Sequence, residues 1–386
     1  MDRIYLDHNA TTPVHPRVID AMLPFFRGTF GNPSSVHQEG RAARVSVDEA
    51  REHVASLIGA EPGEIIFTSG GTEANNLALL GTALASKERR HIITCAVEHP
   101  SVLNPLKQLG PEFQIQILPV DRWGQVSLDS VRDALTEATL MVSLQHGNSE
   151  VGTLQDIETI GEFLHERGVM FHTDAVQSAG KLPLDVSRLP VDMLSLSAHK
   201  LYGPKGVGAL FLRRGANQLF STMAGGNQER KRRGGTENVP GIAGFGVACA
   251  LARERLAQGG TDRLRALRNR LRDRIGERIP GVVVLGHPES LLPNTLSCGF
   301  PHISGDALLI GLDMEGVAVS AGTACSSGSP LPSHVLTAMQ VDLEQVPAVV
   351  RFSLGWENTE EQVDRVVEIL ERCMRFRNEE VSPEVT

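Results

Sequence analysis

The sequence predicts an α/β fold built around a mainly parallel sheet with helices on both of its faces. From about residue 50 to residue 215, short β-rich runs alternate with helical patterns, which is typical of βα units. In open α/β sheets, ligands bind beyond the carboxyl ends of the strands, so polar motifs that follow the strands should meet at one edge. The expected strands cover residues 65–68, 91–94, 115–118, 140–143, 170–172, 193–196 and 208–211.

The last third of the chain predicts a smaller α+β domain. A charged helical stretch at about residues 250–278 separates it from the βα units, and 386 residues suffice for two hydrophobic cores. We expect a large domain over residues 15–254 and a small domain made of residues 1–14 and 255–386. The elements expected in this last third are strands at 282–284, 294–297 and 350–353 and helices at 306–315 and 360–375.

Composition limits the classes of function. A net charge of −9 argues against a surface that binds nucleic acid directly. There is no secretory signal pattern and no apolar run long enough to span a membrane. The cysteines are odd in number and widely spaced, which predicts reduced thiols and a cytoplasmic location without a disulfide or zinc framework. They are Cys95, Cys249, Cys298, Cys325 and Cys373.

A glycine-rich segment at residues 70–76 (GGTEANN) follows the first expected strand and opens a helix. Glycines allow a tight turn there, and the free N–H groups and dipole of a helix N-terminus suit a phosphate. The lysine of a nucleotide P-loop and the GxGxxG spacing are both missing. The segment is therefore a candidate phosphate cradle, with an ordinary strand-to-helix turn as the alternative.

A lysine and an aspartate follow two consecutive expected strands. Lys200 comes after residues 193–196, and Asp174 comes after residues 170–172. Pyridoxal phosphate (PLP) enzymes need a lysine that forms a Schiff base with the cofactor. They also need a carboxylate that keeps the pyridine nitrogen protonated, so that the ring withdraws electrons. A solvated lysine and a helix-capping aspartate are the simpler interpretations, but both residues share a sheet edge with the phosphate cradle.

At these residues the sequence resembles the cysteine desulfurases of the NifS/IscS type (group I), within the class V aminotransferase family. The most specific match is residues 320–328 (SAGTACSSG) with 332–336 (PSHVL), a cysteine loop that related PLP aminotransferases lack. The resemblance implies the fold of PLP-dependent transferases of fold type I. The other matching segments are 6–12, 32–37, 70–76, 98–101, 172–177, 197–206, 228–230, 235–239 and 350–355.

The resemblance also implies a set of cofactor contacts. Lys200 would hold PLP covalently, Asp174 would pair with the pyridine nitrogen, and Gln177 would contact the phenolic oxygen, with Asn148 nearby. His99 would stack on the ring and assist proton transfer. The residues implied as phosphate ligands are Gly71, Thr72, Ser197 and His199, with Thr236 from the second subunit of a homodimer.

The implied reaction converts L-cysteine to L-alanine and leaves a persulfide on Cys325. Arg351 would bind the substrate carboxylate with its two-pronged guanidinium group, assisted by Asn148 and Asn9. The implied partner is a sulfur-acceptor protein, such as an iron–sulfur scaffold, or a thiolation system. No resident metal is implied, and Cys325 would contact a nascent iron–sulfur cluster only through its persulfide.

Three other functions stay open on the sequence. A selenocysteine lyase or another class V PLP aminotransferase would keep the same cofactor site, and the Cys325 loop argues against the aminotransferase more firmly than against the lyase. A catalytically idle sulfur-transfer scaffold is a different class, and the intact Lys200, Asp174, His99 and Cys325 argue against it.

Overall fold

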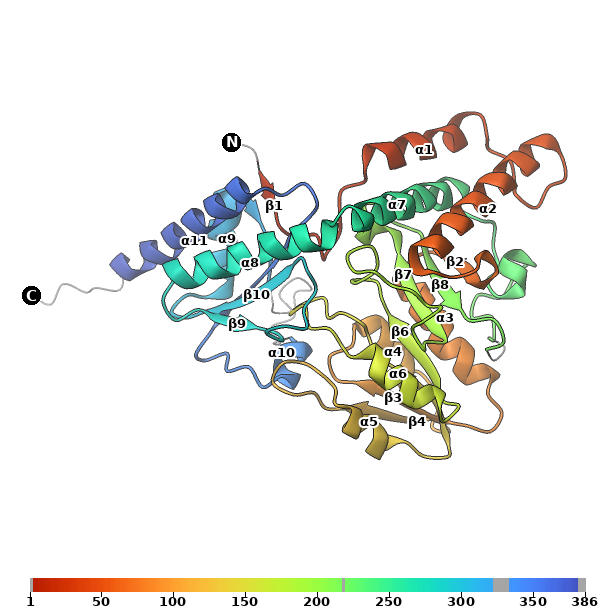
Figure 1. The fold of residues 1–386 in the computed structure, drawn as a ribbon, viewed down its shortest axis with the longest axis horizontal. Coiled ribbons are helices and arrows are strands. Elements are labelled where there is room, and N and C mark those ends of the chain that lie inside the picture. Colours follow the sequence, from red (N-terminus) through yellow and green to blue (C-terminus); the bar gives the residue numbers. More distant parts are fainter. Residues whose placement is uncertain (1–2, 217–218, 322–332, 381–386) are drawn as a thin grey trace, which may run out of the picture.

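The fold consists of two units that are joined end to end by helices α7 and α8 (Figure 1). The computed structural model describes residues 3–216, 219–321 and 333–380, with the side chains of 376–380 left out. The elements up to the junction are β1 (Ile4–Tyr5), α1 (Pro16–Arg27), α2 (Gln38–Ile58), η1 (Pro62–Glu64), β2 (Ile65–Thr68), α3 (Gly71–Ala85), β3 (His91–Cys95), α4 (Pro100–Lys107), β4 (Gln114–Leu118), α5 (Leu128–Ala134), β5 (Thr139–Ser143), α6 (Ile157–His165), β6 (Met170–Asp174), β7 (Met193–Ser197), η2 (Ala198–Lys200), β8 (Gly208–Leu212), η3 (Gln228–Lys231) and α7 (Val239–Ala257). They are followed by α8 (Gly260–Arg278), β9 (Val283–Leu285), β10 (Thr295–Phe300), α9 (Gly305–Met314), β11 (Val317–Ala318), β12 (Ser320–Ala321), α10 (His334–Ala338), β13 (Ala348–Ser353) and α11 (Glu360–Glu380).

The first unit is built on a seven-stranded sheet with the strand order β2-β8-β7-β6-β5-β3-β4. Strand β8 pairs antiparallel with both of its neighbours, and the other pairs are parallel. The predicted mainly parallel α/β fold is therefore confirmed. Each of the seven strands expected in this region exists, with ends that differ from the prediction by at most two residues.

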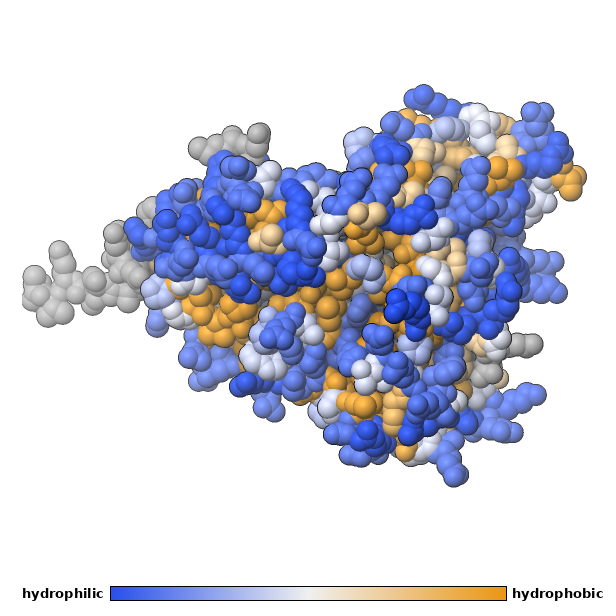
Figure 2. Space-filling model, in the orientation of Figure 1, coloured by the Kyte–Doolittle hydropathy of each residue, from blue (hydrophilic) through white to orange (hydrophobic). Residues whose placement is uncertain are grey.

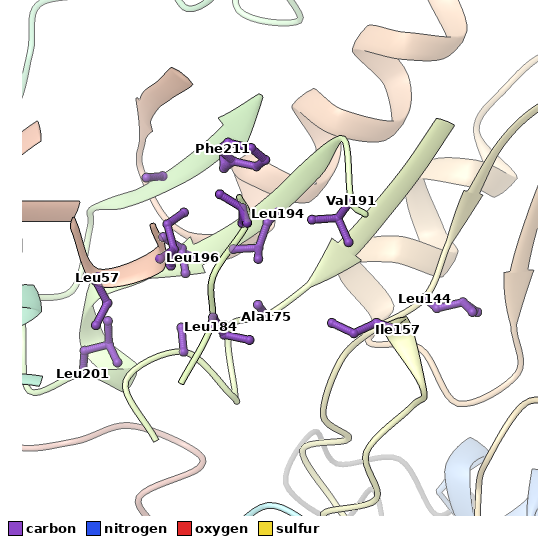
Figure 3. Close-up of a cluster of buried hydrophobic side chains, with 14 of the residues drawn as sticks. Leu57, Leu144, Ile157, Ala175, Leu184, Val191, Leu194, Leu196, Leu201 and Phe211 are labelled. Atoms are coloured by element: carbon purple, nitrogen blue, oxygen red, sulfur yellow. The ribbon is translucent and has the colours of Figure 1, made fainter. Parts of the chain in front are cut away.

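Both faces of this sheet are buried except at the edge strand β4, because neighbouring residues of the other strands point into different apolar clusters. Phe67 and Phe211 face one cluster, whereas Ile66 and Leu210 face the other. The first cluster packs against α2 and α7, and the second packs against α3 and α4. Figure 3 shows part of the first cluster, where Leu194, Leu196 and Phe211 of the sheet lie near Leu57 of α2.

The second unit is a four-stranded antiparallel sheet with the order β12-β13-β10-β9. Helices α8, α9 and α11 bury a separate core with it that includes Leu271, Phe300, Leu312, Phe352 and Leu370. The N-terminal strand β1 pairs with β11 of this unit. These contacts support the division into residues 15–254 and residues 1–14 with 255–386, which we propose as the domain boundary.

The structure adds features that the sequence did not indicate. Helices α1 and most of α2 precede the region in which alternation was expected, and both pack on α7. The charged stretch at 250–278 is not one helix, because Gly259 adopts a left-handed conformation with φ of 77° between α7 and α8. Glycine adopts this conformation without the steric cost that other residues have. Within the described residues, every helix is too short or too polar to cross a bilayer.

A buried ion pair holds the strained segment η3 against the first unit. Glu229, Arg230 and Lys231 all have positive φ angles, which is uncommon for residues other than glycine. The Glu229 carboxylate accepts two hydrogen bonds from Arg51, at 2.7 and 2.8 Å, and one from the Phe67 N–H at 3.0 Å. The two side chains are only 9% and 4% exposed, so the pair is cut off from water.

We predict that Glu229→Ala destabilises the protein by about 3–5 kcal/mol, because it leaves the Arg51 guanidinium buried without its partner. Asp48→Ala is the matched control, since it removes an arginine–carboxylate pair with Arg44 whose side chains are about half exposed. That change should cost at most about 1 kcal/mol. Urea unfolding monitored by circular dichroism measures both free energies, and equal losses would contradict the assignment.

Candidate active site

The polar motifs meet in one pocket of about 790 Å³ at the carboxyl edge of the seven-stranded sheet. Strands β2, β6 and β7 all end there, and β12 and β13 of the second unit close the other side. A pocket of this size suits a cofactor together with a small substrate. The predicted site residues that line it are Asn9, Gly71, Thr72, His99, Asp174, Gln177, Ser197, His199, Lys200 and Arg351.

The phosphate cradle is formed by the N-terminus of α3. Gly70 has a φ angle of 155°, a conformation that favours glycine, and it turns the chain from β2 into the helix. A Cβ atom on Gly71 would lie only 2.8 Å from a methyl carbon of Val176 and would fill the cradle. The first-turn N–H groups, Thr72, and Ser197 from the end of β7 therefore face a space that suits a phosphate.

Lys200 reaches into the pocket from η2, directly after β7. Its Nζ donates to the backbone carbonyls of Asn9 and, at 2.7 Å, Ala10. The pKa of Lys200 is lowered to about 8, chiefly by burial and then by the positive charge of Arg351, whereas Asp7 and Asp174 act in the opposite direction. An amine with this pKa is partly neutral near physiological pH, as a nucleophilic or basic lysine must be.

Asp174 ends β6 and faces the same pocket. Its Oδ1 accepts the Val176 N–H at 2.9 Å, and its Oδ2 accepts an N–H of Asn75 at 2.7 Å. Both carboxylate oxygens therefore have a donor, an arrangement that suits the ionised form. The side-chain nitrogen of Gln177, just beyond, donates to the Asn9 carbonyl at 3.0 Å.

Two of the histidines that line the pocket were predicted from the sequence. His99 is the N-cap of α4, and its Nδ1 contacts the Ser101 hydroxyl at 2.8 Å. Burial lowers the pKa of His99, although its ring remains accessible from the pocket. Burial also lowers the pKa of His199 to about 4, with a smaller contribution from Lys200.

Arg351 of β13 is largely buried, and it lines the pocket. Its Nη2 pairs with Asp7 at 2.7 Å, and its Nη1 donates to the Ser149 carbonyl at 3.0 Å. Its Nε has no partner among the described residues, although it is buried. A guanidinium group that lines a pocket is suited to a carboxylate ligand.

Three predicted residues do not line this pocket. Asn148 is buried, and it donates to the Val97 carbonyl and caps the turn at residues 150–151. Thr236 is exposed and borders a separate small pocket with Ser69 and Gly206. Cys325 lies outside the described residues.

The sequence did not identify several polar residues at or beneath the pocket. Burial raises the pKa of Glu98 to about 8, and it lowers the pKa of Lys181 to about 7 with a contribution from Lys200. Glu150 and His334 line the pocket, and Asn75 lies on the buried face of α3. Asn75 carried a usable signal, because it is a polar residue on the face of the helix that buries Ala74, Leu77 and Ala78.

We predict that covalent attachment of PLP to the cofactor-free protein accelerates with pH up to about 8 and then levels off. Only the neutral amine of Lys200 can attack, and its pKa is lowered to about 8. Stopped-flow absorbance after mixing with PLP gives the rate, and Lys200→Ala should show no attachment. A rate that still rises about tenfold per pH unit above pH 9 would show an amine with an unperturbed pKa.

Comparisons with known proteins agree with this geometry. Residues 4–366 match the model of the family described as Aminotransferase class-V. The chain is 50% identical to "Putative cysteine desulfurase IscS 1" of Bacillus subtilis (strain 168), covering 94% of this chain and 96% of that protein. It is 45% identical to "Cysteine desulfurase IscS" of Methanosarcina thermophila, covering 97% and 93%.

Solved structures agree as well. A "NIFS-LIKE PROTEIN" superposes with a TM-score of 0.90 at 39% identity, covering 97% of this chain and all of that one. "SspA in complex with cysteine" superposes with a TM-score of 0.79 at 36% identity, covering 91% and 98%. The resemblance and the fold type expected from the sequence are confirmed, and the chain belongs to the class V aminotransferase family and, within it, to the cysteine desulfurases.

Proposed function

We propose that this protein is a PLP-dependent cysteine desulfurase that converts L-cysteine to L-alanine and leaves the sulfur on Cys325. The observation that carries the proposal is the convergence of Lys200, Asp174 and His99 on one pocket that Arg351 also lines. The family to which the chain belongs supports the same proposal.

The described residues fit PLP. A glycine cradle at a helix N-terminus suits the phosphate, and the partly neutral Lys200 amine suits the aldehyde. Asp174 offers a carboxylate for the pyridine nitrogen, and His99 offers a ring that can stack. When bound, PLP supplies an electron sink that stabilises negative charge at the substrate Cα.

The protein residues then have separate tasks. We assign Arg351 to the substrate carboxylate, because its guanidinium group lines the same pocket as Lys200. With PLP bound, the Lys200 amine would take the Cα proton of the substrate, for which the pKa of about 8 is well placed. Asn9 and Gln177 keep the pocket wall in place through their hydrogen bond.

We assign sulfur transfer to Cys325. Its thiolate attacks the sulfur of the bound cysteine, the Cβ–S bond of the substrate breaks, and its electrons pass to the substrate carbon, which becomes the alanine methyl group after protonation. L-Cysteine and one thiol thus become L-alanine and one persulfide, and no oxidant is consumed. Burial raises the pKa of the Cys95, Cys249 and Cys298 thiols, which makes them poor nucleophiles.

We further propose a homodimer in which Thr236 completes the phosphate site of the second subunit. Thr236 is exposed and does not line the pocket of its own chain, which is compatible with this role. Exposed apolar side chains on α1, on α2 and between them support association. They are Ile19, Leu23, Phe26, Phe30, Val36 and Val45. Figure 2 shows apolar residues among hydrophilic ones in this part of the surface.

The sulfur acceptor belongs to the same proposal. A persulfide on Cys325 can be passed to an iron–sulfur scaffold or to a thiolation system, and both require a thiol that stays reduced. A cytoplasmic location follows from that requirement.

We predict that Cys325→Ser keeps PLP bound and binds cysteine but fails to release alanine, since a neutral hydroxyl does not accept sulfur. In the unmodified protein, mass spectrometry after one turnover should find one added sulfur on Cys325. Cys373→Ser is the control, because Cys373 is a half-buried thiol on α11 that should be silent. Alanine release at the unmodified rate by Cys325→Ser would favour a lyase that ejects sulfide directly.

We predict that a mixed dimer of Lys200→Ala and Thr236→Ala chains recovers about half of the normal activity, because one of its two sites then has both residues intact. The two chains carry different affinity tags, and alanine formation is compared with that of each parent. Activity no higher than that of the Thr236→Ala parent would show that Thr236 serves its own chain.

A further inference from the structure

A single buried amide connects the carboxylate and the imidazole that face the pocket. Asn75 lies on α3, one turn after the phosphate cradle, and is 1% exposed. Its side-chain nitrogen lies 2.7 Å from Asp174 Oδ2 and 2.8 Å from Ser101 Oγ. Asn75 therefore links the cradle helix to the end of β6 and to the first turn of α4.

The direction of these hydrogen bonds is fixed by Asp174. An ionised carboxylate can only accept, so the Asn75 amide must present its N–H₂ group and not its oxygen. The amide oxygen is left buried and without a partner among the described residues. Both amide hydrogens are thus committed, one to Asp174 and one to Ser101.

The hydrogen bond from Asn75 to Ser101 also determines which atom donates between Ser101 and His99. Because its hydroxyl oxygen already accepts from Asn75, the hydroxyl hydrogen is free to be donated to His99 Nδ1, 2.8 Å away. The Ser101 backbone N–H donates to the same Nδ1 at 3.1 Å. Two donors at Nδ1 keep that nitrogen unprotonated, and the proton of the neutral ring then sits on Nε2.

The charges around His99 agree with a neutral ring. Burial lowers its pKa, and the positive charges of Lys200 and His334 act in the same direction. The Asp174 carboxylate opposes them without reversing the shift. The ring nitrogen Nε2 makes no hydrogen bond within the described part of the chain, and His99 lines the pocket.

We propose that Asn75 and Ser101 are positioning residues that hold His99 as the neutral Nε2–H tautomer and orient the Asp174 carboxylate, so that one amide links the orientation of the carboxylate to the tautomer of the imidazole. The basic nitrogen of His99 then faces Ser101 and not the pocket. His99 offers a hydrogen-bond donor to the reaction, and Lys200 is left as the base. The role of His99 in the reaction rests on the proposed function, whereas the hydrogen bonds and the tautomer of His99 do not.

The tautomer can be read directly. Protein with ¹⁵N-labelled histidine, both PLP-loaded and PLP-free, should show an unprotonated Nδ1 and a protonated Nε2 for His99 at neutral pH. Loss of the signals in His99→Gln assigns them. A protonated Nδ1 in both forms would overturn the proposal.

The relay is tested by three variants. Ser101→Ala removes one donor from Nδ1 and should raise the pKa of His99, whereas Ser101→Thr keeps the hydroxyl and should leave the titration unchanged. Asn75→Leu should also raise the pKa of His99, because the Ser101 hydroxyl can then turn and accept a hydrogen bond instead of donating one to Nδ1. Asn75→Leu alone should also weaken PLP binding about tenfold, since Asp174 loses a donor, whereas Ser101→Ala should stay within about twofold.

An unchanged His99 titration in Asn75→Leu would show that Asn75 does not act through Ser101. If that variant does not fold, as judged by circular dichroism, Asn75→Ala replaces it, because it leaves space and no bulk. Neither readout requires turnover. A protein that shows both effects but never forms alanine would therefore refute the desulfurase assignment and leave this inference standing.

Discussion

The parallel pairing of β6 with β7 is the constraint on which the active site depends. Asp174 lies opposite Ser195 in this pairing, so the two strands end side by side with Lys200 just beyond. A shift of one residue in register would turn Asp174 to the other face of the sheet and remove it from the pocket. Parallel strands also need a crossover connection, and the segment between these two strands carries Gln177 and Lys181.

Burial is the first cause of most of the electrostatic character of the pocket. It lowers the pKa of Lys200 to about 8, of Lys181 to about 7 and of His199 to about 4. The positive charge of Lys200 contributes to the lowered pKa of Lys181, because like charges close together at low dielectric disfavour ionisation. Lys200 and Arg351 supply positive charge in the pocket, but Asp7, Glu150 and Asp174 line it as well. Binding of a phosphate and a substrate carboxylate therefore depends on these two side chains and on the N–H groups of the cradle.

The sequence predicted the strands well because they are buried on both faces and therefore read as short apolar runs between turns. It did not predict α1 or the start of α2, since α1 contains Pro24 and α2 is rich in charged residues. The sequence also did not predict the break at Gly259, because the residues on both sides of it favour a helix. The network of Asn75 with Ser101 was also out of reach, because it joins side chains that only the tertiary fold brings together.

The N-terminal segment shows how the two units share control of the reactive lysine. Its strand β1 pairs with β11 of the second unit, and the Asn9 N–H donates to the Ser353 hydroxyl of β13. The carbonyls of Asn9 and Ala10, on the same short segment, accept the Lys200 amine of the first unit. The direction of that amine is thus set by backbone groups that are anchored to the second unit. A shift of one unit against the other would move these acceptors before it moved the lysine, so the position of Arg351 on β13 and the orientation of the Lys200 amine are coupled through the chain itself.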